Sequence, residues 1–161
     1  MRPEDSPGMA ALDPALSSLG FEYGDMSPER VTGRLTVTTP CCQPSGYIHG
    51  GVFALMAESL ASYGAFIAAG FQRVAAVNLC INHLSSPASA AAAAVHGEAR
   101  PLEYTAGKII QVWEVDFWAA GPLGPEKGAL VVTSRVVPVC DFPPSDAVGH
   151  IVSTLKKHSK L

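Results

Sequence analysis

A single carboxylate, Glu58, lies in the middle of the most apolar stretch of the chain, residues 43–70. It is the only side chain between His49 and Arg73 that is charged at neutral pH. A carboxylate is costly to bury unless another group pairs with it. The neighbouring residues are apolar or small on all sides of a predicted helix, which favours burial of that helix over the alternative of a solvent-facing glutamate. Glu58 is therefore the leading candidate for catalysis.

The segment His49-Gly50-Gly51 is expected to open this helix. A helix N-terminus presents unpaired N–H groups and a partial positive charge, and glycine lets a substrate approach the backbone closely. The Gly50 amide could therefore polarise a carbonyl and stabilise an oxyanion. Four residues after Glu58, Ser62 shares its helix face. This pair suits a nucleophile, or a general base acting on a water that the serine orients, and the residues leave both open.

The spacing between Gly50 and Glu58 predicts a site shared between two chains. The two positions are eight residues apart, and that length of straight helix spans about 12 Å. A carbonyl bound at the Gly50 amide therefore cannot reach the Glu58 carboxylate of the same helix. If both groups serve one reaction, a second copy supplies one of them, which predicts a homodimer with composite, symmetry-related sites.

Strands joined by short links are expected around the helix. Asp13 is expected to cap a short helix at 14–19, and Gly70 to end the long one. A C-terminal amphipathic helix is expected within 147–155. Alternating or β-branched residues predict strands at 31–39, 76–84, 95–104, 108–118 and 130–139. Short links favour antiparallel pairing, so this order predicts an α+β hotdog fold, an antiparallel sheet wrapped around one long central helix.

Composition bounds the class of protein. The chain has 161 residues, 48% of them hydrophobic and 16% charged, which fits one rather apolar domain with some surface covered by other subunits. A net charge of -3 argues against a general nucleic-acid binder. The long helix could span a membrane by length, but its Gly, Ser, Ala and Glu58 content argues against this. Four cysteines without metal-ligand spacing predict reduced thiols, and no metal or cofactor is expected.

Two tails flank the predicted domain. Residues 1–12 are expected to be disordered, 13–140 to form the hotdog domain, and 141–161 to form the C-terminal helix and a targeting tail. The N-terminal residues lack the basic start and apolar run of a secretory signal. The last three residues, Ser159-Lys160-Leu161, match the peroxisomal address that an import receptor reads. They predict peroxisomal localisation, with an ordinary basic tail as the alternative.

A wider pattern resembles the hotdog acyl-CoA thioesterases that use a catalytic glutamate. Its residues are Gln43, His49, Gly50, Gly51, Glu58, Ser59 and Ser62. Further similarity lies at residues 19–22, 41–44, 81–84, 107–113 and 133–136. With the Ser-Lys-Leu end, this longer set resembles the plant-type peroxisomal 1,4-dihydroxy-2-naphthoyl-CoA thioesterases of phylloquinone biosynthesis.

The resemblance implies a role for each matching residue. Glu58 would attack the thioester carbonyl or activate water, the Gly50 amide would polarise that carbonyl, and Ser62 would assist Glu58. Gln43 and His49 would position the thioester, although His49 as a plain helix cap is an alternative. The implied substrate and CoA contacts are Gly51, His83, Leu84, Ser85, Ser86, Thr105, Ala106, Gly107 and Lys108. His83 also fits a core histidine, and the family likeness favours a tetramer built from two dimers.

Other function classes fit less well. A hydratase–dehydratase would need an Asp/His pair near the helix start, and no Asp occurs between Met26 and Val115. The G-x-S-x-G motif of serine hydrolases, a Walker loop and a dinucleotide fingerprint are absent from the sequence. A broad-specificity peroxisomal acyl-CoA thioesterase and a non-catalytic acyl-CoA-binding protein remain as alternatives.

Overall fold

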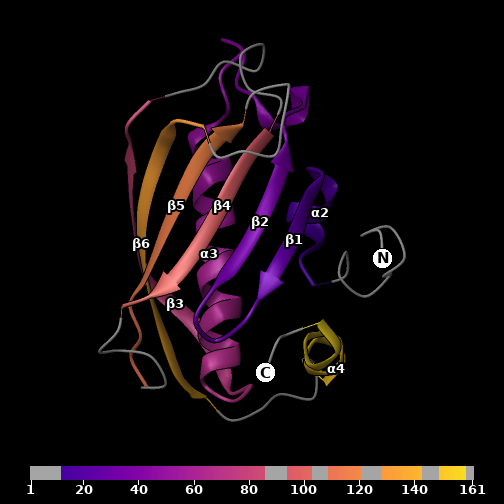
Figure 1. Cartoon of the computed structure of the whole chain (residues 1–161), viewed down its shortest axis with the longest axis vertical. Helices are drawn as coiled ribbons and strands as arrows, with labels where there is room; N and C mark the ends of the chain where they lie inside the picture. The colour runs from indigo at the N-terminus through magenta and orange to yellow at the C-terminus, as the bar shows by residue number, and fades with distance from the viewer. Residues whose placement is uncertain (1–11, 86–93, 103–108, 121–127, 143–148, 159–161) are drawn as a thin grey trace.

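One antiparallel sheet packed on a long helix forms the body of the computed structural model (Figure 1), which describes residues 12–85, 94–102, 109–120, 128–142 and 149–158. The elements are α2 (Pro14–Ser18), β1 (Phe21–Met26), β2 (Val31–Thr36), a 3-10 turn (Thr39–Cys41), α3 (Gly50–Ala68), β3 (Arg73–His83), β4 (Ala94–Pro101), β5 (Trp113–Ala120), β6 (Leu130–Phe142) and α4 (Gly149–His158). The six strands are ordered β1-β2-β4-β5-β6-β3, with every pair antiparallel. The predicted hotdog fold is confirmed.

Strand β1 is an element that the sequence pattern did not predict. It pairs with β2 at one edge of the sheet, and α2 lies beside it (Figure 1). Its sequence, FEYGDM, does not alternate cleanly between apolar and polar residues, and its register shifts between Tyr23 and Met26. The predicted strand at 31–39 was too long, because β2 ends at Thr36 and the chain turns at Thr39–Cys41.

Helix α3 crosses one face of the sheet and packs one side into the core. It starts after His49 and ends before Ala69, with Gly70 in the left-handed conformation (φ 67°) that the predicted glycine cap requires. Large apolar side chains on its sheet side, such as Phe53, Met56 and Leu60, are fully or almost fully buried. By length and apolar composition α3 could cross a membrane, but 61% of its most apolar window is buried within the chain.

A notch in α3 receives the largest buried side chain, Trp113 of β5. A methyl group added at Gly64 would lie 2.3 Å from the Trp113 ring, so only glycine permits this approach. The indole N–H of Trp113 donates to the Gln111 side chain at 2.8 Å, and Gln111 Nε2 donates to the Ala65 carbonyl at 3.4 Å. Both side chains are 0% exposed. The notch therefore fixes how α3 sits on the sheet.

Helix α4 confirms the predicted C-terminal amphipathic helix. Leu155 is buried, and the ammonium of Lys156 lies 5.3 Å from the centre of the Phe71 ring. The targeting residues Ser159, Lys160 and Leu161 lie outside the described residues.

Candidate active site

The start of α3 is capped by the imidazole of His49. Its Nδ1 accepts a hydrogen bond from the Gly51 N–H at 2.9 Å, and its carbonyl accepts from the Val52 N–H at 2.9 Å. Because Nδ1 is an acceptor, the neutral ring carries its proton on Nε2, which can donate to a substrate. Within the described part of the chain, no acceptor is bonded to the Gly50 N–H. His49 is thus a helix cap whose Nε2–H has no bonded acceptor among the described residues.

His83, at the end of β3, lies against the first residue of α3. A methyl group at Gly50 would be 3.1 Å from the Nε2 atom of His83. The His83 ring is exposed and lies 6.0 Å from the Phe53 ring, centre to centre. The alternative of a buried core histidine is therefore wrong. The fold brings His49, Gly50 and His83 together at one end of α3.

Gln43 belongs to a compact loop that leads into the helix. Its N–H donates to the Tyr47 carbonyl at 2.9 Å, and its carbonyl accepts from Gly46, which has the positive φ (81°) of a tight turn. The Gln43 side chain is exposed and lines an open pocket of about 490 Å³ with Thr38, Thr39 and Cys42. Glu58 does not line this pocket.

Glu58 is exposed in the single chain, which corrects the expectation of a helix buried on all sides. The sheet covers only one side of α3. The opposite side carries a row of exposed or partly exposed residues, which we call the open stripe: Gly51, Ala54, Leu55, Glu58 and Ser62. The common position of Glu58 and Ser62 on this stripe agrees with their predicted shared face.

The continuity of α3 keeps the two central groups of the predicted site apart. Gly50 and Glu58 lie on the same uninterrupted helix, so about 12 Å of helix separates them. Gly50 is partly exposed and Glu58 is exposed. The single chain therefore presents both groups to a neighbour without joining them in one site.

The predicted CoA contacts are described only in part. Leu84 is 56% exposed, and the amides of Leu84 and Ser85 both donate to the Val131 carbonyl, at 2.9 and 3.1 Å. Ser86, Thr105, Ala106, Gly107 and Lys108 lie outside the described residues, so their roles stay predictions. Among the described residues, no cluster of three or more His, Cys, Asp or Glu side chains could hold a metal ion.

Residues 45–125 match the thioesterase superfamily. A curated relative, 1,4-dihydroxy-2-naphthoyl-CoA thioesterase 2 of Arabidopsis thaliana, is 47% identical over 147 residues, 91% of each chain. The chain belongs to the thioesterase superfamily. A second curated relative, the 1,4-dihydroxy-2-naphthoyl-CoA hydrolase of Escherichia coli, is 28% identical over 73% of this chain and 79% of its own. The crystal structure of a thioesterase from Haemophilus influenzae supports the fold, with a TM-score of 0.70 at 23% identity over 91% of this chain and 94% of its own.

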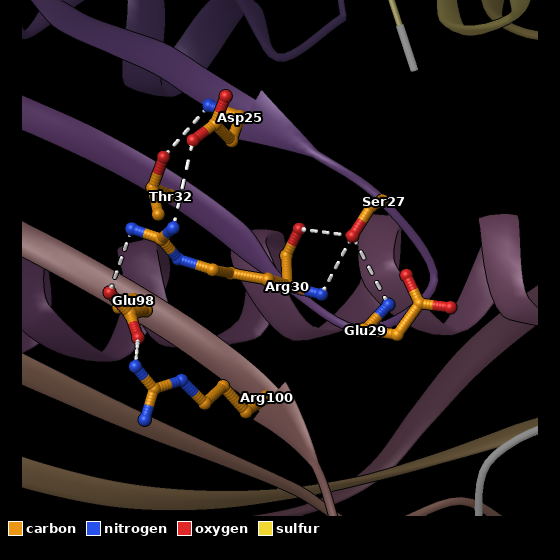
Figure 2. A network of polar contacts seen from close by, with 7 residues as sticks. All are labelled: Asp25, Ser27, Glu29, Arg30, Thr32, Glu98 and Arg100. Carbon is orange, nitrogen blue, oxygen red and sulfur yellow. Dashed lines mark hydrogen bonds and ion pairs between the residues drawn. The ribbon is translucent and has the colours of Figure 1, made fainter. Parts of the chain in front are cut away.

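An ion network around one buried carboxylate, on the outer face of this thioesterase's sheet, was not predicted (Figure 2). Glu98 of β4 has a side chain only 2% exposed, and it pairs with Arg30 at 3.2 Å and with Arg100. Arg30 follows the turn after β1 and also lies 3.8 Å from Asp25, whose N–H donates to Thr32 at 2.8 Å. The network therefore ties the β1–β2 turn to β4. It depends on the register that places Thr32 opposite Glu98, which no local sequence signal gives.

Proposed function

We propose that this superfamily member hydrolyses an aromatic acyl-CoA, with 1,4-dihydroxy-2-naphthoyl-CoA as its main substrate, to 1,4-dihydroxy-2-naphthoate and CoA. The observation that carries this proposal is the 47% identity to the Arabidopsis 1,4-dihydroxy-2-naphthoyl-CoA thioesterase over 91% of both chains. The similarity to the Escherichia coli hydrolase named for the same substrate supports it. The reaction would serve phylloquinone biosynthesis.

The proposed mechanism assigns a step to each group. The Gly50 N–H and the Nε2–H of His49 hold the thioester carbonyl oxygen and stabilise the oxyanion. Glu58 either attacks the carbonyl carbon or takes a proton from a water that attacks it, with Ser62 orienting that water. The C–S bond then breaks, and the CoA sulfur leaves and takes up a proton. If Glu58 is the nucleophile, a water then hydrolyses the resulting anhydride. Gln43 positions the thioester in either route.

A second copy of the chain completes the site in this proposal. The open stripe exposes Glu58, and β3 is an edge strand of the six described strands, paired among them with β6 alone, with Val77 62% exposed. Unprotected sheet edges readily pair with another strand, so the two features favour a homodimer that covers both. Gly50 of one protomer and Glu58 of its partner would then face one thioester. Two such dimers would form the tetramer that the family likeness favours.

A panel of CoA esters tests the substrate. Purified protein is expected to release thiol from 1,4-dihydroxy-2-naphthoyl-CoA with a kcat/KM at least about tenfold above that for hydroxybenzoyl-, phenylacetyl- or palmitoyl-CoA, since pocket contacts commonly discriminate by about 10–200-fold. Equal or better hydrolysis of palmitoyl-CoA would overturn the aromatic assignment and favour broad acyl-CoA hydrolysis. Binding of the esters without any thiol release would favour a non-catalytic acyl-CoA-binding protein.

The C-terminal residues carry the proposal for location. Ser159-Lys160-Leu161 follows directly on α4, whose last residues, Lys156, Lys157 and His158, are exposed. We expect a fluorescent protein fused in front of the full chain to enter peroxisomes, because the import receptor reads a free Ser-Lys-Leu end. The same fusion ending at His158 should stay in the cytosol. Equal import of both fusions would contradict the assignment of this tripeptide.

A further inference from the structure

A chain of hydrogen-bonded side chains reaches the turn of α3 that carries Glu58. The hydroxyl of Ser59, the next residue, donates to Asp13 Oδ2 at 2.7 Å and lies 2.6 Å from the Tyr23 hydroxyl. A serine hydroxyl has one proton, and here it goes to a carboxylate that can only accept. Tyr23 must therefore donate to Ser59. The bonds run in one direction, from Tyr23 of β1 through Ser59 of α3 to Asp13.

The carboxylate at the end of this chain is itself fixed. Asp13 Oδ1 accepts from the Leu16 N–H at 3.0 Å and so caps α2. One turn after Ser59, the hydroxyl of Tyr63 donates to the Leu12 carbonyl at 2.6 Å. Burial raises the pKa of Tyr23 well above its ordinary value, which keeps its phenol protonated as a donor. The segment 12–20 is thus fastened to α3 at Ser59 and at Tyr63.

The chemistry of Ser59 is unusual for its place. Ser59 is 8% exposed, inside a helix whose other buried side chains are apolar or glycine. A buried hydroxyl gives no net stability unless it is paired, and alanine forms helix more readily. Inside helices serine commonly bonds to the carbonyl of the preceding turn, but here it bonds to two other elements. These directional bonds add a second fixed point for the rotation of α3, five residues before Gly64, where the notch receives Trp113.

We propose that Ser59, held by Asp13 and Tyr23, is a positioning residue for Glu58 in the proposed thioesterase reaction. Glu58 and Ser59 are adjacent on one rigid helix, so any rotation of α3 that displaces Ser59 displaces the Glu58 carboxylate by the same angle. Catalytic groups need placement within about 0.5 Å. Asp13 and Tyr23 precede residues 45–125, the part of the chain that matches the thioesterase superfamily, so the N-terminal segment contributes to catalysis from outside the matched region.

Kinetics of Ser59→Ala and Asp13→Ala test this role. Each variant is expected to lower kcat about tenfold or more, since a misplacement of about 1 Å can cost about 10²-fold, with KM within about twofold of the unmodified protein. The double variant should lose little kcat beyond either single one, because both remove the Ser59–Asp13 bond. Asp13→Ala also removes the cap of α2, so its Tm should fall further than that of Ser59→Ala. Tyr23→Phe removes the donor to Ser59 but keeps the Ser59–Asp13 bond, and no donor is left without its acceptor. Its kcat should therefore lie between those of the unmodified protein and Ser59→Ala.

Tyr63→Phe is the matched control. It removes a bond to the same N-terminal segment but leaves Tyr23, Ser59 and Asp13 untouched, so Tm should fall while kcat stays within about twofold of the unmodified value. Unchanged kcat in Ser59→Ala and Tyr23→Phe would overturn the positioning role, as would a loss in Tyr63→Phe as large as that in Ser59→Ala. An unmodified protein that hydrolyses no ester would instead overturn the proposed function itself.

Discussion

Glu58→Gln is expected to lower kcat for acyl-CoA hydrolysis by about 10²–10⁴-fold, the range that a positioned acid–base group contributes. Glutamine has nearly the shape of glutamate but can neither accept a proton nor form an acyl intermediate. An uncharged amide is no more costly to cover by the partner protomer than a carboxylate, so Tm should barely move. Thiol release measures kcat, and calorimetry should show CoA-ester affinity within about threefold of the unmodified protein. Full activity in the variant would contradict the mechanism.

A second inactive variant, at Gly50, is needed to test whether Gly50 and Glu58 of one site come from different protomers. Gly50→Pro deletes the N–H proposed to hold the oxyanion, at the first helical position, where proline is well tolerated. His49 already has the extended conformation (φ -66°, ψ 128°) that a residue before proline prefers. The exposed His83 ring must give way slightly, because an added Cβ would lie 3.1 Å from it. This variant should be as inactive as Glu58→Gln while remaining folded.

Mixing the two variants tests the composite site. In a hybrid dimer one site receives an intact Gly50 from one protomer and an intact Glu58 from its partner, whereas the other site has neither. Random exchange makes half of the dimers hybrids, so the mixture should recover up to about a quarter of the unmodified activity. Each variant mixed with itself is the control. No recovery, with subunit exchange verified by native mass spectrometry, would place both groups of a site in one chain.

Features set by neighbouring residues were predictable from the sequence. Asp13 caps α2 with its own carboxylate, and His49 and Gly70 mark the two ends of α3 as expected. Each of these depends on contacts within a few residues, which local rules of capping and turn formation describe. The order of one long apolar helix followed by closely spaced strands then left few antiparallel arrangements.

Features that depend on long-range packing were not predictable. Because α3 is apolar all round, its sequence could not show which side the sheet leaves open, and the exposure of Glu58 was missed. Strand β1 lacks clean alternation, since Gly24 and Asp25 interrupt its pattern. The ion pair of Glu98 with Arg30 and the hydrogen bond of Ser59 to Asp13 both join residues far apart in the chain. Only the assembled fold brings these residues together.

Trp113→Ala is expected to cause the largest loss of stability. Truncating a fully buried tryptophan commonly costs about 3–5 kcal/mol, and the buried Gln111 side chain would also lose its hydrogen-bond donor. In a domain of this size each kcal/mol lowers Tm by about 2–4 °C, so a fall of about 10 °C is expected. Thermal and urea unfolding at fixed protein concentration measure it. A change of only a few degrees would show that Trp113 does not hold α3.

The effect of Gly64→Ala on stability, measured with and without Trp113, tests the notch itself. Gly64→Ala in the unmodified protein places a methyl group 2.3 Å from the Trp113 ring, so overpacking should cost about 1–3 kcal/mol despite the better helix propensity of alanine. In the Trp113→Ala background the ring is gone, and the same change should stabilise the helix by up to about 1 kcal/mol. The reversal of sign measures a coupling that only direct contact explains. An equal cost in both backgrounds would mean that Gly64 serves something other than the tryptophan.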